Sequence, residues 1–221
     1  MRWGGRISVL IAATVIASSA HATPCGPLPV PCMYEGLPFS VTIIDAETRA
    51  PLPDVHVLAE WVMWGHGGRN GPLIVQDAVT NSAGIATFPK WGPIRGYAAG
   101  LVEGYDPVVS FFKPGYEVAI VENRVPPLRD ADERVRRFNQ DGEVFVMSRF
   151  RGTAQSWTEE LRAAPRRSTR ISEDSLRQFR VPYLNRLRRV YEEYLLLPDA
   201  MRDQALRQTL VEHDLRILEG R

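Results

Sequence analysis

The sequence predicts a mainly β protein: an antiparallel β-sandwich over residues 39–149, followed by a C-terminal helical segment over residues 150–221. Short apolar runs with a period of two, separated by glycine and proline, fill the first region, as is typical of sandwiches. From Thr153 onward, the apolar residues recur at helical spacing instead. A chain of 221 residues suits one medium domain or a domain with an appendage.

The first 22 residues are typical of a secretory signal peptide. Arg2 and Arg6 precede a short apolar run over residues 7–16, and residues 20–22 match an A-x-A cleavage site. We therefore expect cleavage after Ala22 and a periplasmic or secreted product. The apolar run is shorter than the ~20 residues of a membrane span, so we expect membrane association only if the signal segment is retained.

Cys25 and Cys32 are the only cysteines, and they lie in a proline-rich segment over residues 23–38. In an oxidising compartment, such a pair is expected to form a disulfide that closes a short loop. A two-cysteine metal site is the alternative, which no nearby histidine of the mature chain supports.

The stretch from Phe39 to Ala59 predicts the first two strands. Residues 41–44 are a β-branched run, and residues 45–53 break it with turn-forming residues. A period of two then resumes, with Val55, Val57 and Ala59 on one face and His56, Leu58 and Glu60 on the other. We expect these two strands to form a β-hairpin.

Further strands are expected between turns that contain glycine or proline. The turn at residues 81–84 places Gly84 where a hairpin requires positive φ. Residues 65–71 read as a glycine-rich loop, and residues 123–140 as a surface excursion with a short helix. The expected strands are Leu73–Val75, Ala78–Thr80, Ile85–Phe88, Val108–Lys113, Val118–Val121 and Glu143–Met147.

Three motifs resemble the carboxypeptidase regulatory-like domains. The first is the strand, turn and strand that contain Asp45, Thr48, Pro51, Leu52, Pro53, Val55 and Val57; Thr80, Asn81, Gly84 and Phe88 form the second, and Lys113, Pro114, Gly115 and Tyr116 the third. The resemblance covers residues 39–121 and extends less closely to residue 147. It implies a transthyretin-like (prealbumin-like) sandwich, used as an accessory module in many exported proteins. A shared fold does not fix the function.

The helical segment is expected to contain a short helix around Trp157 and Leu161, a longer one from Ser172, and one that begins at Pro198. Pro182 is expected to kink or divide the second helix. The last two helices should form an antiparallel hairpin, packed on the sandwich or on itself.

No motif for chemistry accompanies this fold. The sequence lacks the His-x-x-Glu pair of the zinc carboxypeptidases that carry such domains, and it has no Gly-x-Ser-x-Gly elbow or P-loop. His66 is the histidine expected to be most accessible, whereas His56 and His213 are expected to pack or to lie on the surface. We therefore expect no catalytic residue, metal ligand or cofactor.

Two surfaces are candidates for ligand or partner binding. Trp61 and Trp64, with His66 in the adjoining loop, could form an aromatic platform, although burial of the tryptophans is favoured. Val211 and Leu215 could form an apolar patch for a partner, and their alternative is packing on the sandwich.

The near-neutral balance of 27 basic and 26 acidic residues does not indicate a nucleic-acid partner. We expect an exported, non-enzymatic binding or structural protein of the cell envelope, whose partner is an envelope protein or a glycan. The alternatives are a periplasmic hydrolase without a sequence motif and a subunit of an envelope assembly.

Overall fold

The computed structural model describes residues 33–65, 68–95, 100–102, 106–124, 134–164, 173–207, 209 and 211–220. The strands in these ranges are β1 (Met33–Gly36), β2 (Phe39–Asp45), β3 (His56–Gly65), β4 (Gly68–Val79), β5 (Ile85–Phe88), β6 (Trp91–Arg95), β7 (Gly100–Val102), β8 (Val108–Phe112), β9 (Ala119–Glu122), β10 (Val135–Arg136) and β11 (Val144–Met147). The helices are α1 (Ala154–Ala163), α2 (Glu173–Gln178), α3 (Arg180–Leu195), α4 (Asp199–Arg207) and α5 (Val211–Glu219). Residues 1–22, which the sequence predicts to be a signal peptide, and also Cys25, Cys32 and His66 lie outside the described residues.

Two sheets form the sandwich, as predicted. One has the order β11-β2-β5, and the other has the order β4-β3-β8-β9 with β7 also paired to β3. Strands β1, β6 and β10, which the sequence did not predict, form a third, small sheet. Between the two main sheets lies a core whose side chains alternate inward along the strands, among them Val41, Ile43, Val57, Trp61 and Phe111.

The expected hairpin of residues 39–59 is wrong. Strand β2 pairs with β5 and β11, whereas β3 pairs with β4, β7 and β8 in the other sheet. The connecting residues carry the chain from one sheet to the other, and the carboxylate of Asp45 accepts hydrogen bonds from the backbone of Glu47 and Thr48 at the start of this turn. Both strands therefore contribute to one core from opposite sides.

The hairpin in this region is instead formed by β3 and β4. Strand β4 is one continuous strand from Gly68 to Val79, where the sequence predicted two short strands and a long glycine-rich loop. Gly84 has φ of +73°, as predicted, but its turn links β4 of one sheet to β5 of the other. The Asn81 side chain accepts hydrogen bonds from the backbone of Ala83 and Ile85 within this turn.

In the expected surface excursion of residues 123–140, the described part contains β10 and no helix. Asn123 and Gln140 are buried there, and they hydrogen-bond to backbone groups across the segment. Residues 125–133 lie outside the described ranges.

The C-terminal helices begin and end close to the predicted positions. Thr153 caps α1 by accepting a hydrogen bond from the Ser156 backbone at 3.2 Å. The helix is interrupted at Phe179, between α2 and α3, so that Pro182 lies in the first turn of α3. The backbone N–H that proline lacks therefore falls at this interruption. The single helix expected after Pro198 is divided into α4 and α5.

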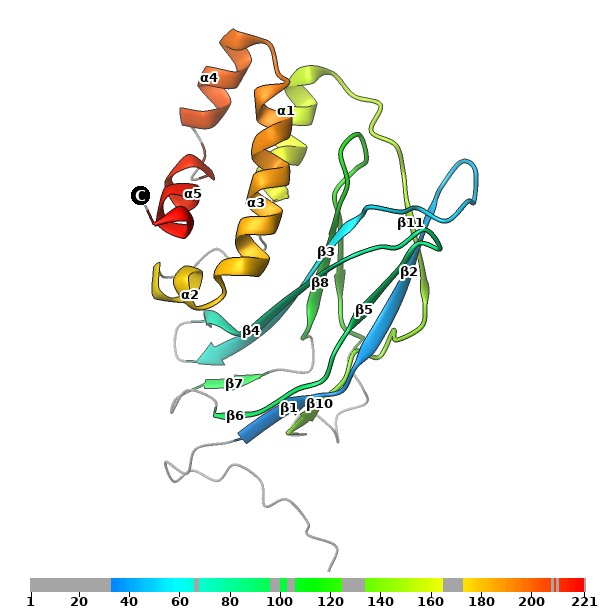
Figure 1. The fold of residues 1–221 in the computed structure, drawn as a ribbon, viewed down its shortest axis with the longest axis vertical. Coiled ribbons are helices and arrows are strands. Elements are labelled where there is room, and N and C mark those ends of the chain that lie inside the picture. The colour runs from blue at the N-terminus through cyan, green and yellow to red at the C-terminus, as the bar shows by residue number, and fades with distance from the viewer. Residues whose placement is uncertain are drawn as a thin grey trace, which may run out of the picture.

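These helices cover the outer face of the β4-β3-β8-β9 sheet, whereas β2, β5 and β11 lie on the far side of the molecule (Figure 1). A second apolar core fills the contact, with Leu58, Val75 and Phe112 from the strands against residues of α1, α2, α3, α4 and α5. Val211 and Leu215 belong to this core, with exposed fractions of 2% and 7%. They therefore do not form the exposed partner patch considered from the sequence.

Candidate functional site

The most polar interior cluster of the described residues centres on Arg186 of α3. Its side chain is completely buried between the helical layer and the sheet, where it reaches β3 and β8. The strand positions that meet it, His56 on β3 and Ser110 on β8, are direct cross-strand neighbours of Phe112 and Leu58 and face the helices. A fully buried arginine is rare and requires partners for all of its hydrogen-bond donors.

Arg186 has five N–H donors, and all five have acceptors. The Nε atom donates to Nδ1 of His56 at 2.9 Å, and one terminal nitrogen donates to the backbone oxygens of His56 and Ser110, both at 2.9 Å. The other terminal nitrogen donates to Ser110 Oγ at 3.2 Å and to the Ala164 oxygen at 2.9 Å. Since Ala164 ends α1, a single side chain connects two helices and two strands.

The hydrogen bonds also fix the tautomer of His56. Because Nδ1 accepts from Arg186, the ring proton lies on Nε2, which donates to Oδ2 of Asp77 at 3.1 Å. Burial, together with the charge of Arg186, lowers the pKa of His56 to about 4, although Asp77 opposes the shift. His56 is therefore neutral at physiological pH.

The two charged members of the cluster remain ionised at neutral pH. Burial lowers the pKa of Arg186 to about 9, and the carboxylates of Glu60 and Asp77 oppose this shift. Burial raises the pKa of Asp77, but hydrogen bonds from His56 and Asn185 outweigh it, so that the net direction is downward. Asn185 donates to the same Asp77 oxygen at 2.9 Å.

The cluster contains serine, histidine and aspartate but does not have the geometry of a nucleophilic triad. In a triad, one histidine nitrogen takes the proton of the serine while the other faces the aspartate. Here the second nitrogen of His56 is occupied by the guanidinium of Arg186, which also binds Ser110 Oγ. What the arrangement can do is fasten α3 and the end of α1 to the sheet.

A second buried pair lies one helical turn away. The Tyr183 hydroxyl of α3 donates to Oε1 of Glu60 on β3 at 2.7 Å, and both side chains are almost fully buried. Because Tyr183 and Arg186 are three residues apart, they lie on the same face of the helix. Both attach that face to polar residues of β3.

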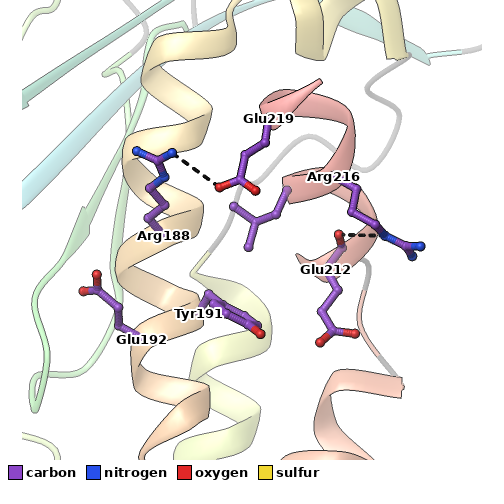
Figure 2. Close-up of a pocket in the computed structure, with 7 residues that line it drawn as sticks. Arg188, Tyr191, Glu192, Glu212, Arg216 and Glu219 are labelled. Atoms are coloured by element: carbon purple, nitrogen blue, oxygen red, sulfur yellow. Dashed lines mark hydrogen bonds and ion pairs between the residues drawn. The ribbon is translucent and has the colours of Figure 1, made fainter. Parts of the chain in front are cut away.

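A groove of about 610 Å³ opens on the solvent side of the helical layer, between α3 and α5 (Figure 2). Its lining residues are Arg188, Tyr191, Glu192, Glu212, Leu215, Arg216 and Glu219. Arg188 already pairs with Glu219 across the groove at 3.3 Å. The lining has charges of both signs and no convergent set of donors or acceptors, so it does not specify a ligand charge.

The candidate residues from the sequence are not brought together. Trp61 has an exposed fraction of 1% and packs edge-on against the buried Trp91, so it does not form an aromatic platform; the favoured alternative, burial, is confirmed for Trp61. Trp64 lies in β3 beside residues of β4 and β7, and His66 lies outside the described ranges. Leu215 lines the groove between α3 and α5, and Val211 is in the core beneath it.

Sequence reasoning missed Arg186, and it assigned no role to His56 or Asp77. One signal for Arg186 was available: it lies three residues after Tyr183 and four before Val190, on an apolar helix face. For His56, the strand pattern gave the face but not the helix that covers it.

Within the described ranges, no group of histidine, cysteine, aspartate and glutamate side chains could hold a metal ion. None of the helices described is long and apolar enough to cross a membrane.

No family model and no curated protein matches this chain. Among solved structures, it is similar to 3-chlorocatechol 1,2-dioxygenase from Rhodococcus opacus 1CP, with 18% identity, a TM-score of 0.32, and coverage of 53% of this chain and 61% of that one. For the full-length major pilin SpaD of Corynebacterium diphtheriae the identity is 12%, the TM-score 0.29 and the coverage 53% and 30%. The chain is also similar to the dioxygenase domain of a dioxygenase carbohydrate-binding protein fusion from Streptomyces sp. SirexAA-E. The identity is 18%, the TM-score is 0.28, and the match covers 51% of this chain and 79% of that one. The chain thus spans less than two thirds of the first two proteins, and these low TM-scores carry no argument about its function.

Proposed function

We propose that this chain is an exported, non-enzymatic binding or structural protein of the cell envelope, located in the periplasm or secreted. Its partner would be an envelope protein or a glycan. The observation that carries the proposal is the hydrogen bonding of the Arg186 cluster. His56 and Ser110 are the buried side chains best suited to chemistry, and both are hydrogen-bonded to Arg186. Those bonds hold the helices on the sandwich rather than leaving a base or nucleophile available.

We further propose that the sandwich is a carboxypeptidase regulatory-like domain. Support comes from a contact between two motifs of that resemblance, since the Tyr116 hydroxyl donates to Oδ2 of Asp45 at 2.7 Å. The backbone bonds to Asp45 and this contact hold the pKa of its carboxyl well below its usual range. The second motif contributes Gly84, whose carbonyl accepts a hydrogen bond from the backbone of Ile43 at 2.8 Å.

The proposed export follows from the basic, apolar and Ala-His-Ala order of residues 1–22. It is tested by expressing the tagged chain in a Gram-negative host and separating periplasm, membrane and cytoplasm. The expected product is a periplasmic protein whose first residue is Thr23. A cytoplasmic product with an intact N-terminus would contradict export.

The non-enzymatic proposal is tested on the purified protein with ester, peptide and glycoside substrates, each compared with a Ser110→Ala variant. We expect no turnover above the uncatalysed rate for either protein. Turnover that the Ser110→Ala change abolishes at an unchanged melting temperature would show that the cluster is catalytic. In parallel, binding to isolated peptidoglycan and to envelope membranes should be saturable.

A further inference from the structure

The imidazole of His56 lies between two charged groups that belong to different layers of the molecule. Arg186, on α3 of the helical layer, donates to Nδ1 at 2.9 Å, and Asp77, on β4 of the sandwich, accepts from Nε2 at 3.1 Å. The ring can accept a hydrogen bond from the helical layer only while it is neutral. A protonated histidine is a donor at both nitrogens, so a flip of the ring does not restore the acceptor.

A proton on Nδ1 of His56 conflicts with Arg186 as long as the two layers are in contact. The new N–H would face the Nε–H of Arg186 across the present 2.9 Å separation, and two positive charges would meet in a buried site. The guanidinium is held in place there, because its terminal nitrogens donate to Ser110, to the His56 carbonyl and to the Ala164 carbonyl. The conflict is therefore relieved only when α3 moves away from the sheet.

The other charged groups around His56 do not remove this conflict. Asp77 favours the charged ring, but burial and the charges of Arg186 and Arg189 oppose it and lower the pKa of His56 to about 4. Glu60 of β3 acts on Arg186, whose charge it favours. Strand β8 and the end of α1 contribute only uncharged groups to the hydrogen bonds of Arg186, Ser110 and the Ala164 carbonyl. A cleft of about 480 Å³ beside His56 is lined by the remaining charged side chains, Asp54, Arg188, Arg189 and Glu192.

The helical layer and the sandwich have separate apolar cores. The core between the two main sheets is built from residues 34–147 and includes none of the described helix residues. The second core joins the helices to Leu58, Val75 and Phe112 on the outer face of the sheet. The chain passes from the sandwich to the helices once, between β11 and α1 (Figure 1). The helices can therefore open as one unit while the sandwich keeps its own core.

We propose that the contact between Arg186 and His56 is an acid-sensitive switch, in which protonation of His56 releases the helical layer from the β4-β3-β8-β9 sheet while the sandwich stays folded. In the open state the charged ring keeps Asp77 as a partner, because both residues belong to the sandwich. Opening exposes the apolar side chains of Leu58, Val75 and Phe112, which the helices cover in the closed state. The inference concerns a conformational change and does not rest on the proposed function.

The size of the effect follows from the pKa of His56 in the two states. The solvated ring of the open state has its ordinary pKa of 6.5, whereas the pKa in the closed state is about 4. The contribution of the neutral ring to closure is therefore complete above pH 6.5 and is lost as the pH falls toward 4. Between about pH 7.5 and about pH 5, the equilibrium constant for opening should rise roughly 30-fold. Arg186, with a pKa of about 9, is charged in both states over this range and adds no pH dependence.

The test is amide hydrogen exchange of the purified full chain at these two pH values, read by mass spectrometry and corrected for the intrinsic exchange rate. Helices separated from their packing partners are marginal in water, so the amides of α3 exchange in the open state. Their protection factors should fall roughly 30-fold between about pH 7.5 and about pH 5. The amides of β2 and β5, which lie in the other sheet, should keep their protection.

The decisive variant is His56→Asn. Its side-chain oxygen is as many bonds from Cα as Nδ1 is, so it can accept from Arg186, but it does not titrate. The pH dependence of α3 protection should be largely lost in this variant, and whatever the carboxylates of Glu60 and Asp77 contribute remains in it. The matched control is His213→Asn, because His213 lies on α5 of the same layer with a half-exposed side chain. This control should retain the full pH dependence.

Three results would overturn the proposal. They are an α3 protection that does not change with pH, an equal fall in the His56→Asn variant, and a parallel fall in β2 and β5, which would indicate global unfolding. If His56→Asn does not fold, nitrogen NMR of the His56 ring in the original chain decides. A ring that becomes charged only as α3 loses protection supports the switch, whereas a charged ring under a fully protected α3 refutes it.

Discussion

Replacing Arg186 with alanine tests whether this residue fastens the helical layer to the sandwich. The change removes five hydrogen bonds and leaves the acceptors of His56, Ser110 and Ala164 buried without their donor. Each unsatisfied buried group costs about 1–3 kcal/mol. In the opposite direction, the variant avoids the desolvation penalty of a buried cation, which raises its stability. The net loss of unfolding free energy is expected to be about 3–5 kcal/mol, as for other broken buried pairs.

The assay is equilibrium unfolding in urea, followed by tryptophan fluorescence and circular dichroism. Arg188→Ala is the matched control, because Arg188 lies on the same helix but is half exposed and makes one surface ion pair with Glu219. That change should cost less than about 1 kcal/mol. Arg186→Lys keeps a charge with three donors and should fall between the two. A loss of less than about 1 kcal/mol for Arg186→Ala would refute the reasoning, because such a loss is typical of surface positions.

Three further predictions follow from individual residues. The pKa of His56 is lowered from 6.5 to about 4 in the folded state. The stability that the neutral ring of His56 gives the fold is therefore fully present above pH 6.5 and is lost as the pH falls toward 4. This loss of unfolding free energy amounts to roughly 3 kcal/mol, and it should be absent from the pH profile of the His56→Gln variant. A Cβ at Gly84 would lie 2.4 Å from a backbone oxygen of β2, whereas one at Gly115, with a similar φ, would meet nothing within 4 Å. Gly84→Ala should therefore lower stability by more than about 2 kcal/mol and Gly115→Ala by about 1 kcal/mol, and equal losses in urea unfolding would contradict this. If Cys25 and Cys32 pair, unreduced protein from the periplasm should show no free thiol and a two-hydrogen deficit by mass spectrometry; two free thiols would exclude the disulfide.

The sequence was informative wherever a pattern depends on nearest neighbours along the chain. Strands β5, β8, β9 and β11 lie within two residues of their predicted bounds because apolar alternation and glycine or proline turns are local features. The positive φ of Gly84 and the break near Pro182 were predicted for the same reason. Each depends on the conformation of a few residues rather than on a distant partner.

Pairing could not be predicted in this way. Alternation shows that Val57 and His56 face opposite sides of a strand, but it does not say which strand lies beside it. The hairpin expected from residues 39–59 failed because β2 and β3 meet through side chains across the core instead of through backbone hydrogen bonds. The ten residues between the two predicted strands, 45–54, are compatible with either arrangement.

The Arg186 cluster was missed for a related reason. A run of arginines and glutamates along a helix is usually a solvated face, and Arg188 and Arg189 fit that description with their surface ion pairs. Arg186 differs only because α3 turns it toward His56 on β3, a residue 130 positions away. The helix pattern identified the apolar face. The polar residues on the strands that accept hydrogen bonds from this buried arginine are known only from the tertiary structure.

The helices cover one outer face of the sandwich and leave the other exposed, and this difference limits where a partner can bind. The face of β3 and β8 carries His56, Glu60 and Ser110, which are buried polar residues, and it depends on the helices to satisfy them. A partner could reach that face only by displacing Arg186 and breaking its hydrogen bonds. The face of β2, β5 and β11 has no such requirement, because its exposed residues are threonine, serine and β-branched aliphatic side chains. Contacts of the sandwich with another protein are therefore expected on the side of β11.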